Sequence, residues 1–234
     1  ITSSMTAFTS DGDYCIAGTE DASLIVWCIS KKRIVARIHA HDHRINAVAY
    51  NSTIDLIVSI DITGKLSYSS AITGSFLHST SLFSEVDLER TLSVVKSEIQ
   101  KNLIERAIFK IEISSLGFVI IISTDSNDNK TEFSSFDLKA RKLNSYITHG
   151  IIDMCHLCTF QDQSEYLFVA TKAPPGGNQS VLYKLRLLNV INLQKFEMGT
   201  CNAKIQCCTF CRERNELFWI ADKKVYSTSI PIAK

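Results

Sequence analysis

The sequence predicts an all-β fold built from a series of small antiparallel sheets. Apolar runs of four to seven residues, rich in Val, Ile, Phe and Tyr, recur along the 234 residues, and runs this short favour strands over helices. Polar turn signals such as Ser10–Asp13 and Thr63–Lys65 separate them. The expected strands are Tyr14–Ala17, Leu24–Ile29, Ile34–Ile38, Ile45–Tyr50, Leu56–Ile60, Phe118–Ile122, Tyr166–Ala170, Val181–Leu187 and Leu217–Ile220.

An internal repeat refines this prediction. Cys15–Trp27 and Leu56–Ser69 both read as strand, tight polar turn and strand, and Trp27 and Ser69 fall at equivalent places 42 residues apart. Three further strand pairs follow at a spacing of about 40 to 50 residues, the period of a four-stranded β-propeller blade. We therefore expect residues 1–234 to form a partial propeller, about five four-stranded antiparallel blades of a seven-bladed type.

One segment departs from the strand pattern. Between Ser84 and Glu105 the apolar residues are spaced by four, three, four and four positions, which is helical spacing. Ser84 followed by Asp87 resembles a capping box. The pattern predicts one amphipathic helix inserted at about residues 84–105, whose apolar stripe either packs on the parent domain or docks a partner. The stripe consists of Leu88, Leu92, Val95, Ile99 and Leu103.

Composition excludes several classes of function. The 25 basic and 24 acidic residues leave a net charge of +1, which gives no electrostatic footprint for nucleic acid. The one notable basic run is Lys31–Arg33. Apolar runs such as Leu24–Ile29 and Phe118–Ile122 are far too short to cross a bilayer, so no transmembrane segment is expected. The initial Ile1 suggests a fragment of a longer protein.

Two segments resemble WD repeats. Thr19–Cys28 (TEDASLIVWC) resembles the end of such a repeat, and His39–Tyr50 (HAHDHRINAVAY) resembles the opening of the next one, with Ala40 in place of the usual Gly. In this family a His, a Ser or Thr, an Asp and a Trp hydrogen-bond across each blade. The resemblance therefore implies a structural network within the blades.

The resemblance assigns that network residue by residue. Asp21 and Trp27 match two of its positions in the first blade. His41 and Ser59 match two in the second, where Thr63 and Ser69 stand in for Asp and Trp. The later blades keep almost none of the signature. Their assignment depends on the regular spacing of the expected strands.

The order of features is also similar to the C-terminal propeller of BEACH-domain proteins. Asp55–Ser59, the Thr63–Gly64 turn and Ala71–His78 carry this similarity, followed by Ile113–Ile122 and Ser134–Leu138. It covers residues 1–82 well and 107–230 loosely. Members of that family are large cytosolic scaffolds in vesicle traffic, autophagy and lysosome-related compartments.

The resemblance implies a non-catalytic, cytoplasmic scaffold that binds proteins, with peripheral membrane association through the full-length protein. One alternative is a WD-repeat subunit or adaptor of another assembly, such as a coat complex or a ubiquitin ligase. Another is a propeller enzyme, which would need acidic or His residues converging near the channel. No Gly-x-Ser-x-Gly elbow and no spacing of Ser, His and Asp indicates a catalytic triad, so no catalytic residue and no cofactor are predicted.

The eight cysteines raise one metal hypothesis. Cys155-x2-Cys158 and Cys208-x2-Cys211 have the spacing of zinc ligands. Both pairs lie in expected strands, where residues i and i+3 point to opposite faces, so neither pair chelates unless the backbone turns there. We therefore expect buried structural thiols and no metal site.

Three other segments are ambiguous. His39, His41 and His43 would share one face of an extended segment, as a metal or pH-sensing cluster would, but the blade role of His41 with solvated neighbours is the simpler interpretation. Asp125–Asn129 begins like a calcium loop yet lacks its Gly and Glu, which favours a polar hairpin loop. Lys172–Ser180, rich in Pro and Gly, is either a flexible hairpin connection or a recognition loop.

Overall fold

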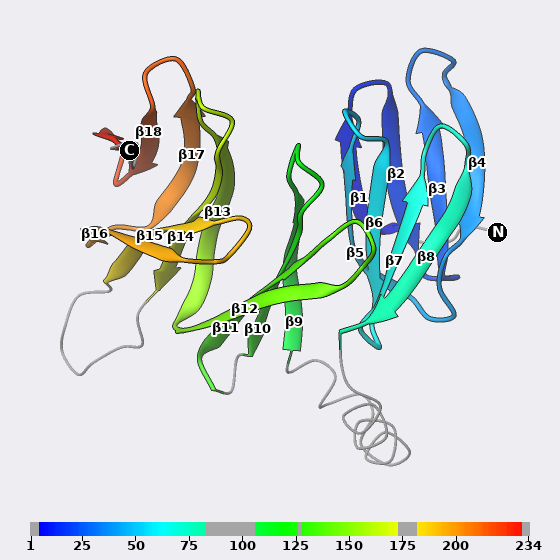
Figure 1. Ribbon diagram of the computed structural model, residues 1–234, viewed down its shortest axis with the longest axis horizontal. Coiled ribbons are helices and arrows are strands. Elements are labelled where there is room, and N and C mark those ends of the chain that lie inside the picture. The colour runs from blue at the N-terminus through cyan, green and yellow to red at the C-terminus, as the bar shows by residue number, and fades with distance from the viewer. Residues whose placement is uncertain (1–4, 83–105, 126–127, 173–181, 231–234) are drawn as a thin grey trace. The chain divides into compact units, whose positions relative to one another are not determined.

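The computed structural model describes residues 5–82, 106–125, 128–172 and 182–230, and this part of the chain is all-β (Figure 1). The predicted helix at 84–105 lies outside the described residues, as does the loop beyond Lys172. The chain forms two compact units, one of residues 1–123 and 134–143, the other of residues 124–133 and 144–234. Each unit is described by itself.

Five antiparallel sheets, named here I to V, follow one another along the chain. Sheet I contains β1 (Met5–Asp11), β2 (Tyr14–Thr19), β3 (Ser23–Cys28) and β4 (Arg33–His39). Sheet II contains β5 (Ile45–Asn51), β6 (Leu56–Asp61), β7 (Lys65–Ser70) and β8 (Ser75–Ser81). Sheet III contains β9 (Arg106–Ile113), β10 (Val119–Asp125), β11 (Lys130–Phe136) and β12 (Lys142–His149). Sheet IV contains β13 (Ile151–Thr159), β14 (Glu165–Lys172), β15 (Tyr183–Asn189) and β16 (Lys195–Cys201). Sheet V contains β17 (Ile205–Cys211), β18 (Glu216–Ala221) and β19 (Lys224–Ser229).

Strand order within every sheet follows the sequence, so each strand pairs with its neighbour through a hairpin. A register shift recurs near the start of the first strand of sheets I, II, IV and V, for example between Ile45 and Ala47 in β5. A second shift recurs between the third and fourth strands of sheets I, II and IV. Because bulges bend and twist strands locally, the repeated positions mark the sheets as copies of one structural unit.

Sheet II has both faces buried. Along β6, Leu56, Val58 and Ile60 face one core, which β9–β11 complete with Ile121 and other apolar residues. Ile57 faces the opposite core, shared with sheet I. Since side chains of a strand alternate between faces, a strand buried on both faces must be apolar or internally bonded throughout, and all six residues of β6 are buried.

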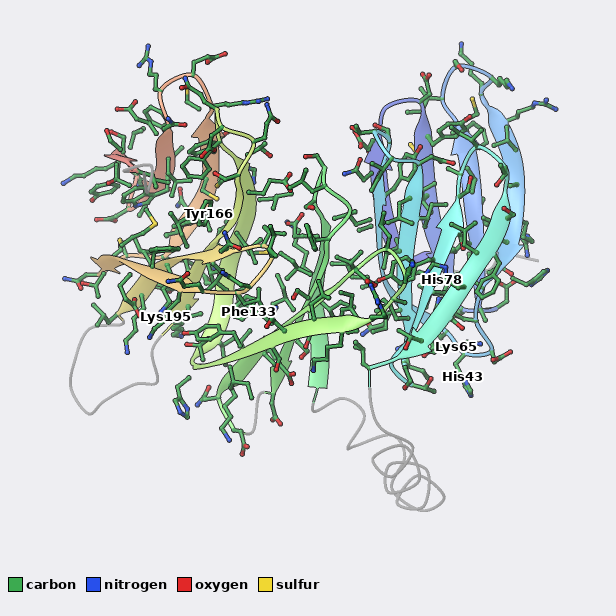
Figure 2. The ribbon with its side chains drawn as sticks, in the orientation of Figure 1. His43, Lys65, His78, Phe133, Tyr166 and Lys195 are labelled. Atoms are coloured by element: carbon green, nitrogen blue, oxygen red, sulfur yellow. The ribbon has the colours of Figure 1, made fainter. Side chains whose placement is uncertain are left out.

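The second unit has a core of its own between sheets IV and V. Phe168, Leu185 and Leu187 of sheet IV pack with Leu217 of sheet V. Burying each such side chain contributes about 1.5 to 3 kcal/mol relative to leaving it exposed. Side chains fill the space between neighbouring sheets of each unit (Figure 2).

The sequence runs located the inner strands well, whereas the outer strands β8, β12 and β16 gave little signal. These outer strands are largely exposed, so no apolar run marks them. The prediction of antiparallel sheets is confirmed, with the difference that sheet V has three described strands where four were expected.

A close approach between sheets I and II gives a test of this packing. Gly74, in the β7–β8 turn, has φ +64°, and a Cβ there would come within 2.7 Å of the Ala36 Cβ. We expect Gly74→Ala to lower the free energy of unfolding by about 1 to 3 kcal/mol, measured by urea denaturation. Ala36→Gly should recover part of that loss in the double variant, because it removes the opposing methyl group. Strict additivity of the two substitutions would contradict the contact.

Candidate functional site

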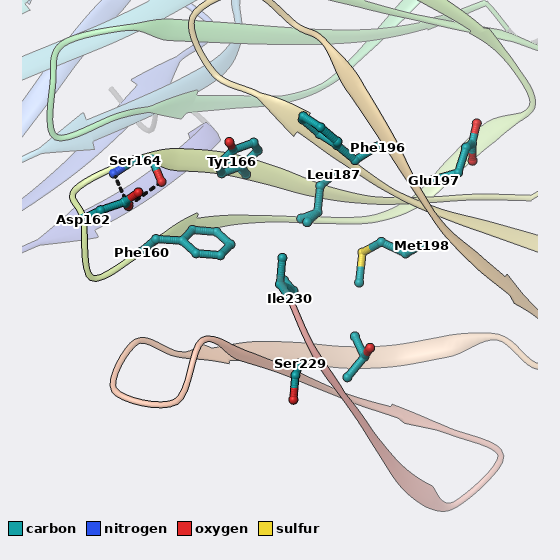
Figure 3. Close-up of a pocket in the computed structure, with 11 residues that line it drawn as sticks. Phe160, Asp162, Ser164, Tyr166, Leu187, Phe196, Glu197, Met198, Ser229 and Ile230 are labelled. Atoms are coloured by element: carbon teal, nitrogen blue, oxygen red, sulfur yellow. Dashed lines mark hydrogen bonds between the residues drawn. The ribbon is translucent and has the colours of Figure 1, made fainter. Parts of the chain in front are cut away.

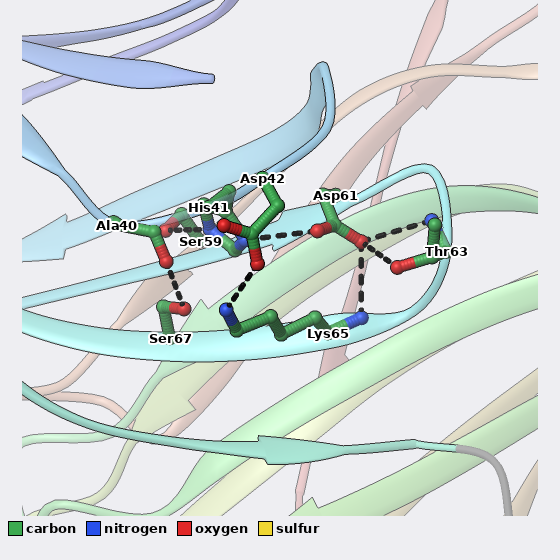
Figure 4. Close-up of polar contacts among 8 residues, drawn as sticks. All are labelled: Ala40, His41, Asp42, Ser59, Asp61, Thr63, Lys65 and Ser67. Atoms are coloured by element: carbon green, nitrogen blue, oxygen red, sulfur yellow. Dashed lines mark hydrogen bonds and ion pairs between the residues drawn. The ribbon is translucent and has the colours of Figure 1, made fainter. Parts of the chain in front are cut away.

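A buried polar network joins the linker before sheet II to two strands of that sheet (Figure 4). His41 lies in the linker between β4 and β5, and its ring nitrogens contact Asp61 Oδ2 at 3.3 Å and Ser59 Oγ at 2.7 Å. Ser59 and Asp61 are two positions apart on β6 and therefore share one face of the sheet. Ser67 on β7 adds a bond from its hydroxyl to the Ala40 carbonyl, at 2.8 Å.

Asp61 is the centre of this network. Its Oδ1 accepts hydrogen bonds from the Thr63 backbone N–H at 2.9 Å, the Thr63 hydroxyl at 2.6 Å and the Lys65 N–H at 3.1 Å. Burial raises the pKa of the carboxyl group, but the hydrogen bonds from His41, Thr63 and Lys65 outweigh burial and hold that pKa below its ordinary 3.8. Asp61 is therefore ionised at neutral pH.

The charge state of Asp61 fixes the direction of its hydrogen bond with His41. An ionised carboxylate only accepts, so His41 Nδ1–H donates to it. In a neutral imidazole, Nε2 then accepts the proton of the Ser59 hydroxyl. The arrangement pins the linker between two sheets to the β6–β7 turn.

Ser59, His41 and Asp61 have the connectivity of a Ser–His–Asp triad, which no sequence spacing indicated. The relative exposures of these residues are 0%, 7% and 1%, and the network lies against the apolar core between sheets I and II. A nucleophile must reach its substrate, and this hydroxyl faces a packed interior. The geometry therefore serves to orient the chain.

The structure brings together only half of the residues assigned by the WD-repeat resemblance. His41 and Ser59 are hydrogen-bonded as described above. Asp21, in the β2–β3 turn, is bonded by the Thr19 hydroxyl and by Arg37 Nη1, the latter at 3.0 Å. The Thr19 bond is the main reason that the pKa of Asp21 is lowered. Trp27 lies near the other end of β3, with 41% of its surface exposed, away from Asp21.

The roles expected of Thr63 and Ser69 in sheet II both need correction. Thr63 was expected in place of the acid, but Asp61 is the acid, and Thr63 donates to it. Ser69 was expected in the Trp position, but its buried Oγ has no hydrogen-bond partner and the residue pairs with Ile57. The register puts Ser67 opposite Ser59 instead. Period-2 alternation from Ser59 was the signal that could have found Asp61.

Sequence reasoning also missed a second network, centred on Arg186 of β15. This arginine is 6% exposed. Its Nη1 donates to the hydroxyls of Thr148 and Thr171 at 2.9 and 3.1 Å, and its Nε donates to both oxygens of Glu197 at 3.0 and 3.1 Å. Burial raises the pKa of Glu197, but Arg186 and Lys195 outweigh burial and lower it. A cation inside the apolar run 181–187 was the available signal.

The second unit contains a pocket of about 330 Å³ between β16 of sheet IV and the end of β19 of sheet V (Figure 3). Its wall is mainly apolar and aromatic, and Glu197 brings the Arg186 network to its rim. Asp162 is exposed, and hydrogen bonds from Ser164 lower its pKa. The pocket is lined by Phe160, Asp162, Ser164, Tyr166, Leu187, Phe196, Glu197, Met198, Thr228, Ser229 and Ile230.

Cys155 and Cys158 lie in β13, and Cys208 and Cys211 lie in β17. Both pairs are thus in strands, as their position within apolar runs predicted. Cys155 and Cys158 are buried, whereas Cys208 and Cys211 are only partly buried. Among the described residues no group of three or more His, Cys, Asp or Glu side chains is placed to hold a metal ion.

The flanking histidines and the described ends of the calcium-like segment can be placed. His39 and His43 are exposed, and His39 Nδ1 contacts the Ser23 hydroxyl at 3.2 Å. Asp125 ends β10 and Asn129 precedes β11, so the calcium-like segment connects two strands of a hairpin. Among the described residues, no helix is long and apolar enough to cross a membrane.

Comparison with known proteins extends only to the fold. No family model and no curated protein matches the chain. Solved structures do match, among them the crystal structure of the computationally designed Ika8 protein, with a TM-score of 0.58 and 13% sequence identity over 95% of this chain. The match covers 57% of the Ika8 chain. The fold thus defines the class, an all-β protein whose described part consists of successive antiparallel sheets of three or four strands.

The network can be tested with two buried serines of sheet II. We expect Ser59→Ala to lower the free energy of unfolding by about 1 to 2 kcal/mol, since it leaves His41 Nε2 buried without its partner. Ser69→Ala is the matched control and should be neutral or stabilising, because the Ser69 hydroxyl has no hydrogen-bond partner. Chemical denaturation of both variants decides the question, and equal losses would argue against the network.

Asp61→Asn tests the charge in the network. Because the folded pKa is lowered, ionisation stabilises the fold above the ordinary value of 3.8, and that contribution is lost as the pH falls through the folded pKa. We expect the substitution to lower the free energy of unfolding by about 1 to 3 kcal/mol at neutral pH. The difference in free energy of unfolding between wild type and variant should become smaller below pH 3.8, as measured by denaturation curves across pH. A difference that does not change with pH would rule out the ionised carboxylate as its source.

Proposed function

We propose that the chain is a non-catalytic protein-interaction scaffold, forming about five blades of a seven-bladed type of WD-repeat-like propeller. Its sequential sheets with bulges at matching places support the propeller assignment. The His41–Ser59 bond supports the WD-like one, since these residues occupy positions that the family uses for its blade network. On the BEACH resemblance, the full-length protein acts in vesicle traffic or autophagy in the cytoplasm, peripherally at membranes.

One contrast carries the proposal. The polar groups with potential for chemistry, His41, Ser59, Asp61 and Arg186, are buried between sheets and bonded to one another or to the fold. The open pocket between sheets IV and V is instead lined by six apolar or aromatic residues and five polar ones, and apolar atoms form most of its surface. Such a lining recognises a ligand by shape and apolar contact.

An extended peptide with a bulky apolar side chain suits this pocket. The pocket volume of about 330 Å³ matches one or two large side chains. Thr228, Ser229 and Ile230, at the end of the edge strand β19, form part of its wall. In the described chain β19 pairs with β18. The scaffold would thus bind a partner's extended segment with its apolar residue in the pocket.

Selection of short random peptides on the purified chain tests this assignment. We expect enriched peptides to carry alternate apolar residues and to lose about tenfold in affinity, about 1.4 kcal/mol, on Phe196→Lys, which puts a charge into the apolar wall. Phe76→Lys is the matched control. Phe76 is also a half-exposed phenylalanine on an outer strand, and its substitution should leave affinity unchanged. No enrichment, or equal loss in both variants, would overturn the peptide site.

A further inference from the structure

The β3–β4 hairpin turn lies at an end of sheet I (Figure 1). Basic and apolar residues are exposed at and beside this turn, which is called the tip here. Lys31, Lys32 and Arg33 are consecutive and all exposed. Around them Trp27, Ile29, Ile34 and Val35 are 36 to 53% exposed. Single apolar residues are common on protein surfaces, but four large ones beside three cations form a patch that indicates a binding surface.

The tip is held in place by backbone hydrogen bonds. The Lys32 N–H donates to the Ile29 carbonyl at 3.2 Å and closes the turn, and Lys32 has φ +51°. The Ile29 N–H donates to the Asp13 carbonyl at 2.8 Å, which ties the tip to the β1–β2 turn. The side chains are therefore presented by a fixed backbone, which lowers the entropic cost of binding.

Neighbouring acids balance only part of the positive charge of the tip. Within the described residues, Lys31, Lys32 and Arg33 form no ion pair with a carboxylate. Of the acids in the adjacent β1–β2 turn, Asp11 accepts a bond from the Ser52 N–H at 2.7 Å, and Asp13 is exposed. Three cations against these two acids leave the tip with an excess of positive charge.

The apolar surface continues onto sheet II. β4 contacts β8, and the Gly74 backbone in the β7–β8 turn packs against Ala36. This turn carries Ile72, which is 67% exposed, and Phe76 follows at the start of β8. Consecutive turns thus extend the apolar area beside the cations.

We propose that this tip docks the protein on an anionic lipid surface. Exposed Trp and Ile enter the interfacial layer of a bilayer, while neighbouring Lys and Arg remain at the level of negative headgroups. A lipid surface fits better than an acidic protein segment, because four large apolar residues are exposed beside the cations and a purely acidic partner would leave them in water. The inference is independent of the peptide pocket.

Vesicle binding by the whole chain tests the proposal. We expect the purified chain to co-sediment with vesicles containing phosphatidylserine about tenfold more strongly than with pure phosphatidylcholine vesicles, with loss at high salt. Lys31→Glu with Lys32→Glu should reduce binding to the level of neutral vesicles. Lys139→Glu with Lys142→Glu makes the same charge change in the β11–β12 hairpin and should change binding less than about twofold.

Tryptophan fluorescence tests insertion separately from attraction. The chain has two tryptophans, so Trp219→Phe leaves Trp27 as the reporter. Its emission should shift to the blue on anionic vesicles and be quenched by brominated lipids. The proposal fails if Trp27 shows no shift, if the Lys31/Lys32 reversal leaves binding intact, or if the tip binds soluble polyglutamate but not vesicles. The last result would assign it to an acidic protein partner.

Discussion

The fold depends on burying both faces of small sheets that cannot do so alone. Alternate residues of an inner strand such as β6 face opposite cores, so every position along it must be apolar or hydrogen-bonded internally. Outer strands such as β8 and β16 escape this demand and are mostly exposed. This gradient from buried to exposed within each sheet explains where the chain tolerates polar residues and where it presents side chains to partners.

Polar residues within the buried layers act as positioning devices. His41, Ser59 and Asp61 fix the linker that leads into sheet II, and Arg186 joins β12, β14, β15 and β16 through Thr148, Thr171 and Glu197. Each network satisfies groups whose burial would otherwise cost stability. Both use threonine hydroxyls, but the charged group at the centre is a carboxylate in one and a guanidinium in the other, so similar sheets are joined by different chemistry.

The pocket and the tip arise in different parts of the fold from the buried networks. The pocket between β16 and β19 exists because two apolar sheet faces meet beside an edge strand. The β3–β4 tip exposes apolar residues that the packing of sheets I and II leaves uncovered. The pocket is lined in part by core residues such as Phe160 and Leu187, whereas the exposed residues of the tip lie outside the cores. Both features occur where hairpin ends and outer strands meet solvent. Recognition on such folds resides in these places while the buried layers supply rigidity.

The sequence by itself determined the strand class, the hairpin order and the period, because short apolar runs, turn residues and period-2 alternation are local properties. It also indicated the pairing of His41 with Ser59 through a family signature. Only the tertiary structure decided that Asp61 is the acid of that network, that the Ser69 hydroxyl has no hydrogen-bond partner and that Arg186 is buried. These depend on strand register and on which sheet packs on which face. The sequence carries only local signs of this geometry, the two-residue step from Ser59 to Asp61 and the single cation in the apolar run 181–187, and neither names the partner across the fold.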